Sequence, residues 1–300
     1  MEVFSTKDTA AYLKVNEKKI YQLVKDGDIP HTRIGGKIIF SREILDRWIR
    51  EKTVQEQNIL VTGSDDALLK RVIDQFNKSS PHVAFYAPLG SIPGLQLLEK
   101  GRAGVCAVHI LDLNGRHSLT YLDRYLDRNE FYVVRLFTRE QGIYLSPGNP
   151  HKIKSFADLF KKKLRFLNRN PGSGTRILID FQTAKLREGM EKQSIQTRDA
   201  YSHLDAGIQV LTGKVDASFG IRYVAEMLKL DFIPVMQEPF DFVIPAHSWE
   251  NRNIVEFLRF FDQSVLFSQM NDLQGYDLSA MGSVVWRPPT SGSSDDSLTR

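Results

Sequence analysis

The sequence has few of the features on which small secreted or membrane proteins depend. Of its 300 residues only one, Cys106, is a cysteine, which excludes an intrachain disulfide. No cysteines and histidines stand at the spacing of zinc ligands, so we expect no metal site. A lone cysteine also favours a reducing compartment. The first thirty residues carry charges throughout and lack the apolar segment of a secretory signal.

Long apolar runs and a strong charge excess are also missing. No run approaches the roughly 18 apolar residues that cross a membrane, so we expect no membrane partner and a cytoplasmic protein. The 40 basic and 36 acidic residues leave a net charge of only +4, which creates no overall attraction to nucleic acid. Any DNA binding must therefore come from local arrangement. The composition is that of a globular protein with two or three folding units.

The first fifty residues show a pattern of three short helices and a hairpin. Ser5 and Asn16 are placed to cap two successive helices, and Asp26-Gly27 ends the second. Gly35-Gly36 between alternating runs predicts a two-residue turn, and Ser41 begins a third helix. This order predicts a winged helix-turn-helix, a motif whose second helix enters the major groove of DNA.

Basic and amide side chains lie where such a motif contacts DNA. They are Asn16 at the turn, Lys18, Lys19, Tyr21 and Gln22 on the second helix, and Arg33 and Lys37 on the hairpin. The run STKDTAAYLKVNEKKIYQLVKDGDIPHTRIGGKIIFSREILDRWI resembles the DNA-binding domain of the excisionase and MerR-related families. The resemblance implies binding to double-stranded DNA, with groove contacts from the second helix and wing contacts from Arg33 and Lys37. An ordinary solvated surface would use the same charged residues.

A change of pattern after residue 50 predicts the domain boundaries. Residues 51–57, EKTVQEQ, are polar and typical of a linker. From Asn58 short apolar runs alternate with amphipathic segments, which predicts an α/β domain of two lobes with largely parallel sheets, over residues 58–285. The runs lie at 59–63, 83–87, 104–110, 131–137, 142–146, 164–168, 216–220, 232–236 and 240–244. Residues 286–300, rich in Pro, Ser and Asp, predict a disordered tail.

Three loops of this second unit place glycines and hydroxyl side chains before a helical segment. They are TGSDD at 62–66, LGSIPG at 89–94 and NPGSGTR at 170–176. The free N–H groups and the dipole of a helix N-terminus favour an anion there. Ordinary helix capping uses the same residue types, so one such loop is weak evidence for an anion site. Three such loops in one domain favour an anion site. Arg176 has two possible roles, to contact that anion or to hold its own loop through an ion pair.

A second resemblance sharpens this expectation. The segments VTGSDD, GSIPGLQLL, GNP, NRNPGSGTR and LDFIPVMQEPFDFVIP resemble the periplasmic-binding-protein-like domain found fused to helix-turn-helix regulators and to molybdopterin-biosynthesis proteins. The resemblance covers about residues 58–270 and implies a type II, two-lobed fold that binds molybdate or tungstate between its lobes. The ligand donors it implies are Ser64, Ser91, Ser173, Gly174, Thr175 and Gly220. The chain departs from this family at Ser218-Phe219, which is bulkier than the usual strand end.

Phosphate is an alternative ligand with a different requirement. Near neutral pH it carries a proton and benefits from a carboxylate acceptor, whereas molybdate and tungstate would be repelled by one. Asp65 or Asp66 directed into the site would therefore favour phosphate. The same residues capping their own helix would favour the metal oxyanions.

No catalytic arrangement is apparent, because the seven histidines are scattered and no serine has a base within predictable reach. We therefore expect no enzyme and no cofactor other than the anion. The main hypothesis is a one-component transcriptional regulator that acts as a homodimer on a two-part DNA site. The alternatives are an excisionase-like architectural DNA-binding protein whose large domain binds other proteins, a transport receptor, and an enzyme of cofactor biosynthesis.

Overall fold

A computed structural model describes residues 2–52, 58–110, 119–161, 164–186, 199–261 and 273–289. The chain divides into two compact units, Met1–Gln57 and Asn58–Arg300. Across the ranges described, no helix combines the length and the apolar character that a membrane span requires.

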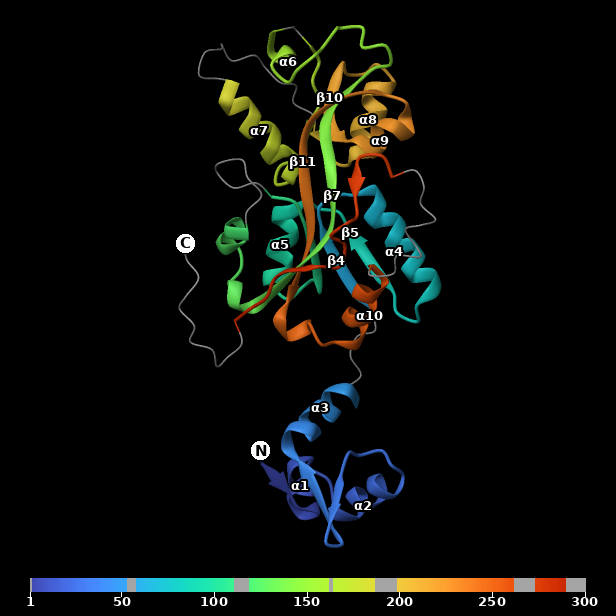
Figure 1. The fold of residues 1–300 in the computed structure, drawn as a ribbon, viewed down its shortest axis with the longest axis vertical. Coiled ribbons are helices and arrows are strands. Elements are labelled where there is room, and N and C mark those ends of the chain that lie inside the picture. The colour runs from blue at the N-terminus through green and yellow to red at the C-terminus, as the bar shows by residue number, and fades with distance from the viewer. Residues whose placement is uncertain are drawn as a thin grey trace. The chain divides into compact units, whose positions relative to one another are not determined.

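The first unit combines three helices with a three-stranded antiparallel sheet in the order β1-β3-β2 (Figure 1). Its elements are β1 Val3–Phe4, α1 Thr6–Tyr12, α2 Glu17–Lys25, β2 Thr32–Ile34, β3 Lys37–Ser41 and α3 Arg42–Lys52. Ser5 and Asp8 form a capping box on α1, and the Asn16 side chain accepts from the Lys19 N–H to cap α2. Gly35 and Gly36 both have positive φ, as the predicted hairpin turn requires.

A small core holds these elements together. Ile20 of α2, Phe40 of β3 and Leu45 of α3 are fully buried in it. Trp48 packs against the same cluster and donates from Nε1 to the Asp28 carbonyl over 2.6 Å. The helix-turn-helix and its hairpin therefore form one packed unit.

The second unit is a mixed α/β domain with an eight-stranded sheet and a separate two-stranded sheet formed by β8 and β9. Its strands are β4 Ile59–Gly63, β5 Ala84–Ala87, β6 Val105–Val108, β7 Phe131–Leu145, β8 Asn168–Arg169, β9 Asp199–Ala200, β10 Ala217–Ile221, β11 Asp231–Pro245, β12 Tyr276–Asp277 and β13 Val284–Trp286. Its α-helices are α4 Ala67–Ser79, α5 Ser91–Glu99, α6 Asp158–Lys161, α7 Gly174–Leu186, α8 His203–Leu211, α9 Arg222–Leu228 and α10 Arg252–Phe261. Short 3-10 helices span Leu119–Arg124, Arg128–Glu130 and Ala246–Ser248.

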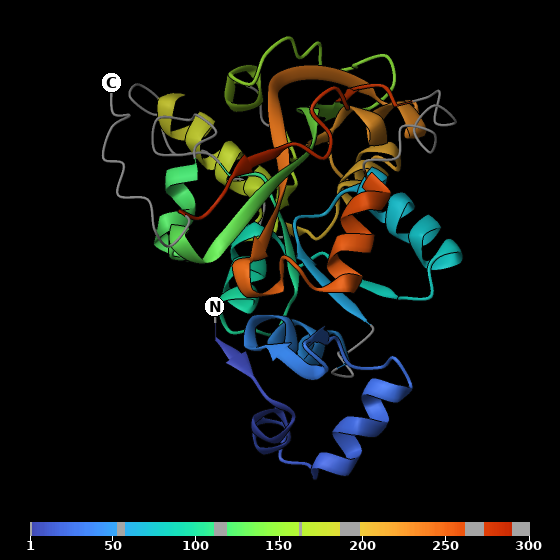
Figure 2. The same cartoon turned by 60° about the horizontal axis from the view of Figure 1, so that its bottom comes forward.

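Two long antiparallel strands, β7 and β11, connect the lobes. Figures 1 and 2 show them side by side, β7 in green and β11 in orange, through the whole second unit. One lobe contains β4, β5, β6, α4, α5 and α10, and the other contains α6 to α9 with β8, β9 and β10 (Figure 1). Each lobe has its own buried clusters of apolar side chains. The predicted two-lobed fold is therefore observed.

Two details of the predicted sheet are wrong. The runs at 131–137 and 142–146 are one strand, β7, and the runs at 232–236 and 240–244 are one strand, β11. Three of the polar residues between the runs, Arg139, Gln141 and Glu238, are buried and hydrogen-bonded to one another or to neighbouring strands, and the strands continue through them. The sheet is also mixed, since only β4, β5 and β6 pair in parallel while β7, β10 and β11 are antiparallel.

The ends of the predicted linker and tail also differ from the structure. Helix α3 continues to Lys52, so the expected linker begins inside a helix, and residues 53–57 lie outside the described residues. Trp286, the first residue of the expected tail, belongs to β13, which pairs with β7. The remainder of that expectation, residues 290–300, also lies outside the described residues.

Candidate functional site

Two of the three glycine loops meet through their serines. Ser64 follows β4 and Ser91 begins α5, and the two hydroxyl groups hydrogen-bond to each other. Both side chains are almost completely buried. Gly63 is required beside them, because it has φ +113° and a Cβ there would lie 2.0 Å from the Ala107 carbonyl oxygen. The structure thus brings these two predicted ligand residues together.

The third loop reaches the same place from the other lobe. Thr175, in the first turn of α7, accepts a 3.1 Å hydrogen bond from the Gln141 side chain. Gly174 packs so closely on His109 that a Cβ would lie 2.0 Å from its carbonyl oxygen. The Ser173 hydroxyl is used differently, since it donates to the Asn170 carbonyl and accepts from the Arg176 N–H. Ser173 therefore caps α7.

Gly220 lies within β10, directly opposite Gly142 of β7. A Cβ on it would come within 2.1 Å of the Tyr144 hydroxyl, so this glycine makes room for that ring. The neighbouring Ser218 hydroxyl donates to the Leu167 carbonyl over 2.9 Å. The contacts of this segment are thus with its own lobe, and a ligand role for Gly220 stays a prediction.

A buried arginine lies at the centre of the site. Arg139 of β7 is 0% exposed, and its Nη1 donates to Asp66 Oδ2 over 2.7 Å and to the Asp65 carbonyl over 3.0 Å. Its Nε donates to Glu238 of β11 over 2.7 Å. Burial lowers the pKa of Arg139, but Glu238 and Asp66 outweigh that effect and raise it overall, so the group stays charged. The guanidinium also lies 4.4 Å from the centre of the Phe240 ring.

Glu238 extends this network to His109 and Gln141. Its Oε2 lies 2.9 Å from His109 Nδ1, and its Oε1 accepts from Gln141 Nε2. The backbone of His109 in turn lies 3.5 Å from the Ser91 hydroxyl. One continuous set of polar contacts therefore joins Ser91 in one lobe to Thr175 in the other.

Three buried polar atoms of this region have no hydrogen-bond partner among the described residues. They are Nη2 of Arg139, Oε1 of Gln141 and Oδ1 of Asn170. A buried guanidinium nitrogen without a protein partner is normally satisfied by an ordered water or a ligand, because leaving it unpaired is costly. Such atoms in a polar site are the groups that a ligand would satisfy.

Further contacts connect the lobes at the rim of the site. Asp65 Oδ2 accepts from the His203 N–H at the start of α8 over 2.7 Å, and the Ile92 N–H donates to the Gly172 carbonyl. Arg169 donates to His203 Nδ1 over 2.6 Å. Burial lowers the pKa of His203 well below its usual range, and the arginine lowers it further. This histidine is therefore neutral.

The two aspartates have roles that bear on the choice of anion. Asp66 caps its own helix, because Oδ1 accepts from the Leu69 N–H over 2.8 Å, while its other oxygen binds Arg139 and Tyr276. Asp65 accepts from the start of α8 in the opposite lobe. Arg176 braces its loop, since it donates to the Arg169 carbonyl and pairs with Asp180. These contacts engage the carboxylates with protein groups.

The predicted DNA-contacting residues lie on the surface of the first unit. Lys18, Lys19, Tyr21, Gln22, Arg33 and Lys37 are all exposed, Tyr21 to 52%. Asn16 caps α2, and Gln22 donates to Asp26 one turn on. The cations are thus available to a phosphate backbone, while the two amides already have partners within the helix.

The sequence analysis did not identify Arg139, Gln141 and Glu238 as site residues. They interrupt apolar runs, which made TREQ at 138–141 and QEP at 237–239 look like connections between strands. The signal against a break was that neither interruption contains a turn-forming pair such as Asn-Gly. Among the residues that the structure describes, no group of three His, Cys, Asp or Glu side chains could hold a metal ion.

Comparison with known proteins identifies both units. Residues 73–262 match the PBP superfamily domain and residues 3–53 match a helix-turn-helix domain. The uncharacterized protein YvgK of Bacillus subtilis (strain 168) is 27% identical over 307 residues, which cover 94% of this chain and 97% of that protein.

Solved structures show the same fold at low sequence identity. The sulfate-binding protein SubI of Mycobacterium tuberculosis H37Rv is similar with a TM-score of 0.52 and 14% identity, covering 73% of this chain and 86% of that one. An ABC-type phosphate transport receptor of Vibrio cholerae has a TM-score of 0.50 and 15% identity, covering 74% and 99%. With a family match over more than half of its length, the chain belongs to the PBP superfamily and has a helix-turn-helix domain at its N-terminal side.

Proposed function

We propose that this protein is a transcriptional regulator whose DNA affinity depends on a small oxyanion bound between the lobes of the second unit. A helix-turn-helix domain joined to a PBP-like domain is the arrangement of a ligand-sensing regulator. The proposal assigns binding without turnover to the second unit. Two short recognition elements on a two-part site would supply the base contacts, so we also propose a homodimer.

The observation that carries this proposal is the buried guanidinium of Arg139 with its unpartnered Nη2. Around the same network lie the hydroxyl groups of Ser64, Ser91 and Thr175, and the N-terminal ends of α5 and α7. Donors and helix dipoles that converge from two lobes suit an anion that both lobes can hold at once.

Among oxyanions we favour molybdate or tungstate. Asp66 caps its own helix and Asp65 accepts from the opposite lobe, so the protein itself uses both carboxylates. A fully deprotonated anion then needs no proton acceptor from the site. Phosphate is the second candidate, because the unpartnered Oε1 of Gln141 could accept its proton. The solved relatives are named for phosphate and sulfate, which belong in the same test.

Calorimetric titration of the full chain with molybdate, tungstate, phosphate and sulfate tests the proposal. We expect one of the first two to bind, and Thr175→Val to weaken that binding about tenfold or more by removing a site hydroxyl. Thr183→Val is the matched control, since that hydroxyl on the same helix donates to the Ile179 carbonyl. Binding of none of the four anions would refute the anion-sensing role and favour the architectural alternative.

A further inference from the structure

Helix α8 carries apolar side chains on two of its faces. One face, with Ala206 and Val210, is buried in a cluster shared with β10 and α9, in the lobe that contains α6 to α9 (Figure 1). The other face carries Leu204, Ile208 and Leu211, which are 39% to 45% exposed. Their spacing of four and then three residues places them in one row along the helix. We call these three residues the outer row of α8.

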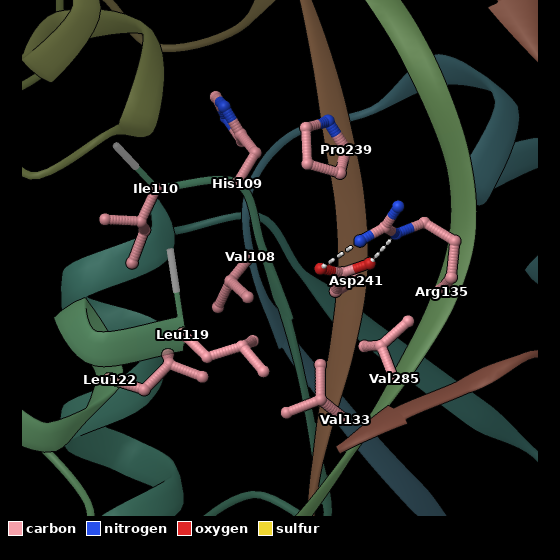
Figure 3. Close-up of a pocket in the computed structure, with 10 residues that line it drawn as sticks. All are labelled: Val108, His109, Ile110, Leu119, Leu122, Val133, Arg135, Pro239, Asp241 and Val285. Carbon is pink, nitrogen blue, oxygen red and sulfur yellow. Dashed lines mark hydrogen bonds and ion pairs between the residues drawn. The ribbon is translucent and has the colours of Figure 1, made fainter. Parts of the chain in front are cut away.

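The composition of α8 is that of a helix covered on both faces. Of its nine residues only Asp205 carries a charge, and a helix that is apolar all round is typical of a buried position. Apolar side chains that have been covered look different in this unit. Val108, Leu122 and Val133, for example, pack into one buried cluster (Figure 3). The outer row of α8 is therefore a surface that a further molecule would cover.

The exposed area is of the size that a protein interface uses. Tyr201, just before the helix in the sequence, is 76% exposed and adds to the apolar area at this end of α8. Together with the outer row it exposes about 400 Å², taking roughly 200 Å² for a large side chain. Each partner contributes about 800 Å² to a standard interface, so these four side chains would supply about half of one side. A polar rim supplies the remainder.

The outer row fits a second copy of itself in an antiparallel arrangement. About a two-fold axis, Ile208 would face its own counterpart, and Leu204 would face Leu211 of the other copy. Asp205, in the first turn, would then lie within reach of the exposed Lys214, which follows the last turn of the other helix. A parallel pair would instead bring like charges together. The opposed helix dipoles also favour the antiparallel pair.

We propose that two copies of this chain pair through the outer row of α8, antiparallel and about a two-fold axis. The inference rests on the homodimer of the proposed function and assigns the surface that forms it. The same helix begins at the contact between the lobes, because the His203 N–H donates to Asp65 of the opposite lobe over 2.7 Å. A change in how the lobes meet would therefore act directly on the helix that holds the two copies together.

Sedimentation of the full chain, without DNA or anion, tests this interface. We expect the natural chain to be a dimer at about 50 μM, and Ile208→Lys to raise the dimer dissociation constant about tenfold or more. That variant places two like charges together at the two-fold axis, and the side chain is exposed in the single chain. Leu60→Lys is the matched control, because Leu60 of β4 is also an exposed aliphatic residue, and it should leave the dimer unchanged.

The outcomes separate this inference from the proposed function. A dimer that Ile208→Lys leaves intact, or that Leu60→Lys weakens equally, would overturn the α8 interface alone. A natural chain that stays monomeric would overturn both the interface and the proposed homodimer. Neither result touches the anion titration, in which Ile208→Lys should bind the oxyanion as the natural chain does, since the site residues are buried and Ile208 is exposed.

An exchange of charges tests the antiparallel arrangement. Lys214→Glu should weaken the dimer, because the new carboxylate would face Asp205 of the other copy. Adding Asp205→Lys to the same chain should restore the dimer, since each copy then again offers opposite charges to the other. A protein that has merely lost its fold would not recover in this way. A folded double variant, by its melting transition, that dimerised no better than Lys214→Glu would contradict the arrangement.

Discussion

Arg139 is a positive charge in the middle of a strand, fully removed from water and held by two carboxylates. Such an arrangement is weak as a source of stability, since desolvation offsets much of the attraction. A role as a fixed hydrogen-bond donor explains the buried guanidinium better, because its Nη2 has no partner among the described residues. The neighbouring His109 and His203 are buried with lowered pKa values, because burial disfavours their charged forms.

These histidines predict how stability depends on pH. Their folded pKa values lie below the ordinary value of 6.5, so below that pH the unfolded chain takes up protons that the folded chain does not. The free energy of unfolding should therefore fall on acidification, by at most about 1.4 kcal/mol per pH unit for each histidine. Calorimetric melting at pH 7.5, 6.5 and 5.5 measures this.

The control for this prediction is His203→Asn, whose amide oxygen can still accept from Arg169 but cannot titrate. Its melting temperature should decline less steeply than that of the natural chain between pH 6.5 and 5.5. An identical decline in both proteins would mean that His203 is not a source of the pH dependence.

At the scale of the element, sequence patterns predicted local features well and long-range ones poorly. The caps of α1 and α2, the Gly35-Gly36 turn and the three glycine loops follow from rules about neighbouring residues. The length of β7 and β11 does not, because three of their central residues, Arg139, Gln141 and Glu238, are polar and find their buried partners only among residues far apart in the sequence. The missed site residues lie in those same central segments.

Close packing of α7 on β6 gives an element-scale prediction. In Gly174→Ala the new Cβ would lie 2.0 Å from the His109 carbonyl oxygen, so α7 must shift. We expect a loss of about 1–3 kcal/mol in stability and weaker anion binding, measured by melting and by titration. Gly104→Ala is the control, because its Cβ would have only ordinary contacts, the nearest at 3.7 Å. Equal effects of the two variants would contradict this account of the loop.

Helix α2 gives a second prediction at the scale of the element. If its exposed cations contact DNA phosphates, Lys19→Gln should weaken DNA binding and reduce the slope of log affinity against log salt by about 1. Lys70→Gln, an exposed lysine on α4 of the second unit, is the charge-matched control. Binding titrations at several salt concentrations measure the slope, and unchanged slopes in both variants would exclude Lys19 as a phosphate contact.

At the scale of the whole molecule, the chain joins a unit with exposed cations on a helix-turn-helix to a two-lobed unit with a buried polar site. Both lobes contribute to that site, through Ser64 and Ser91 on one side and Thr175 on the other. A ligand held by both lobes would favour the state in which they are together. Regulation further requires that this state and the open one differ in DNA affinity.

The coupling between the two units is the central claim, and one measurement tests it most directly. A DNA fragment selected by the full chain from a random library would be titrated with the protein, in the absence and in the presence of a saturating oxyanion already shown to bind. The account predicts a change in DNA affinity of about fivefold or more, in either direction, that is lost in Thr175→Val. The same DNA affinity with and without the bound anion would contradict it.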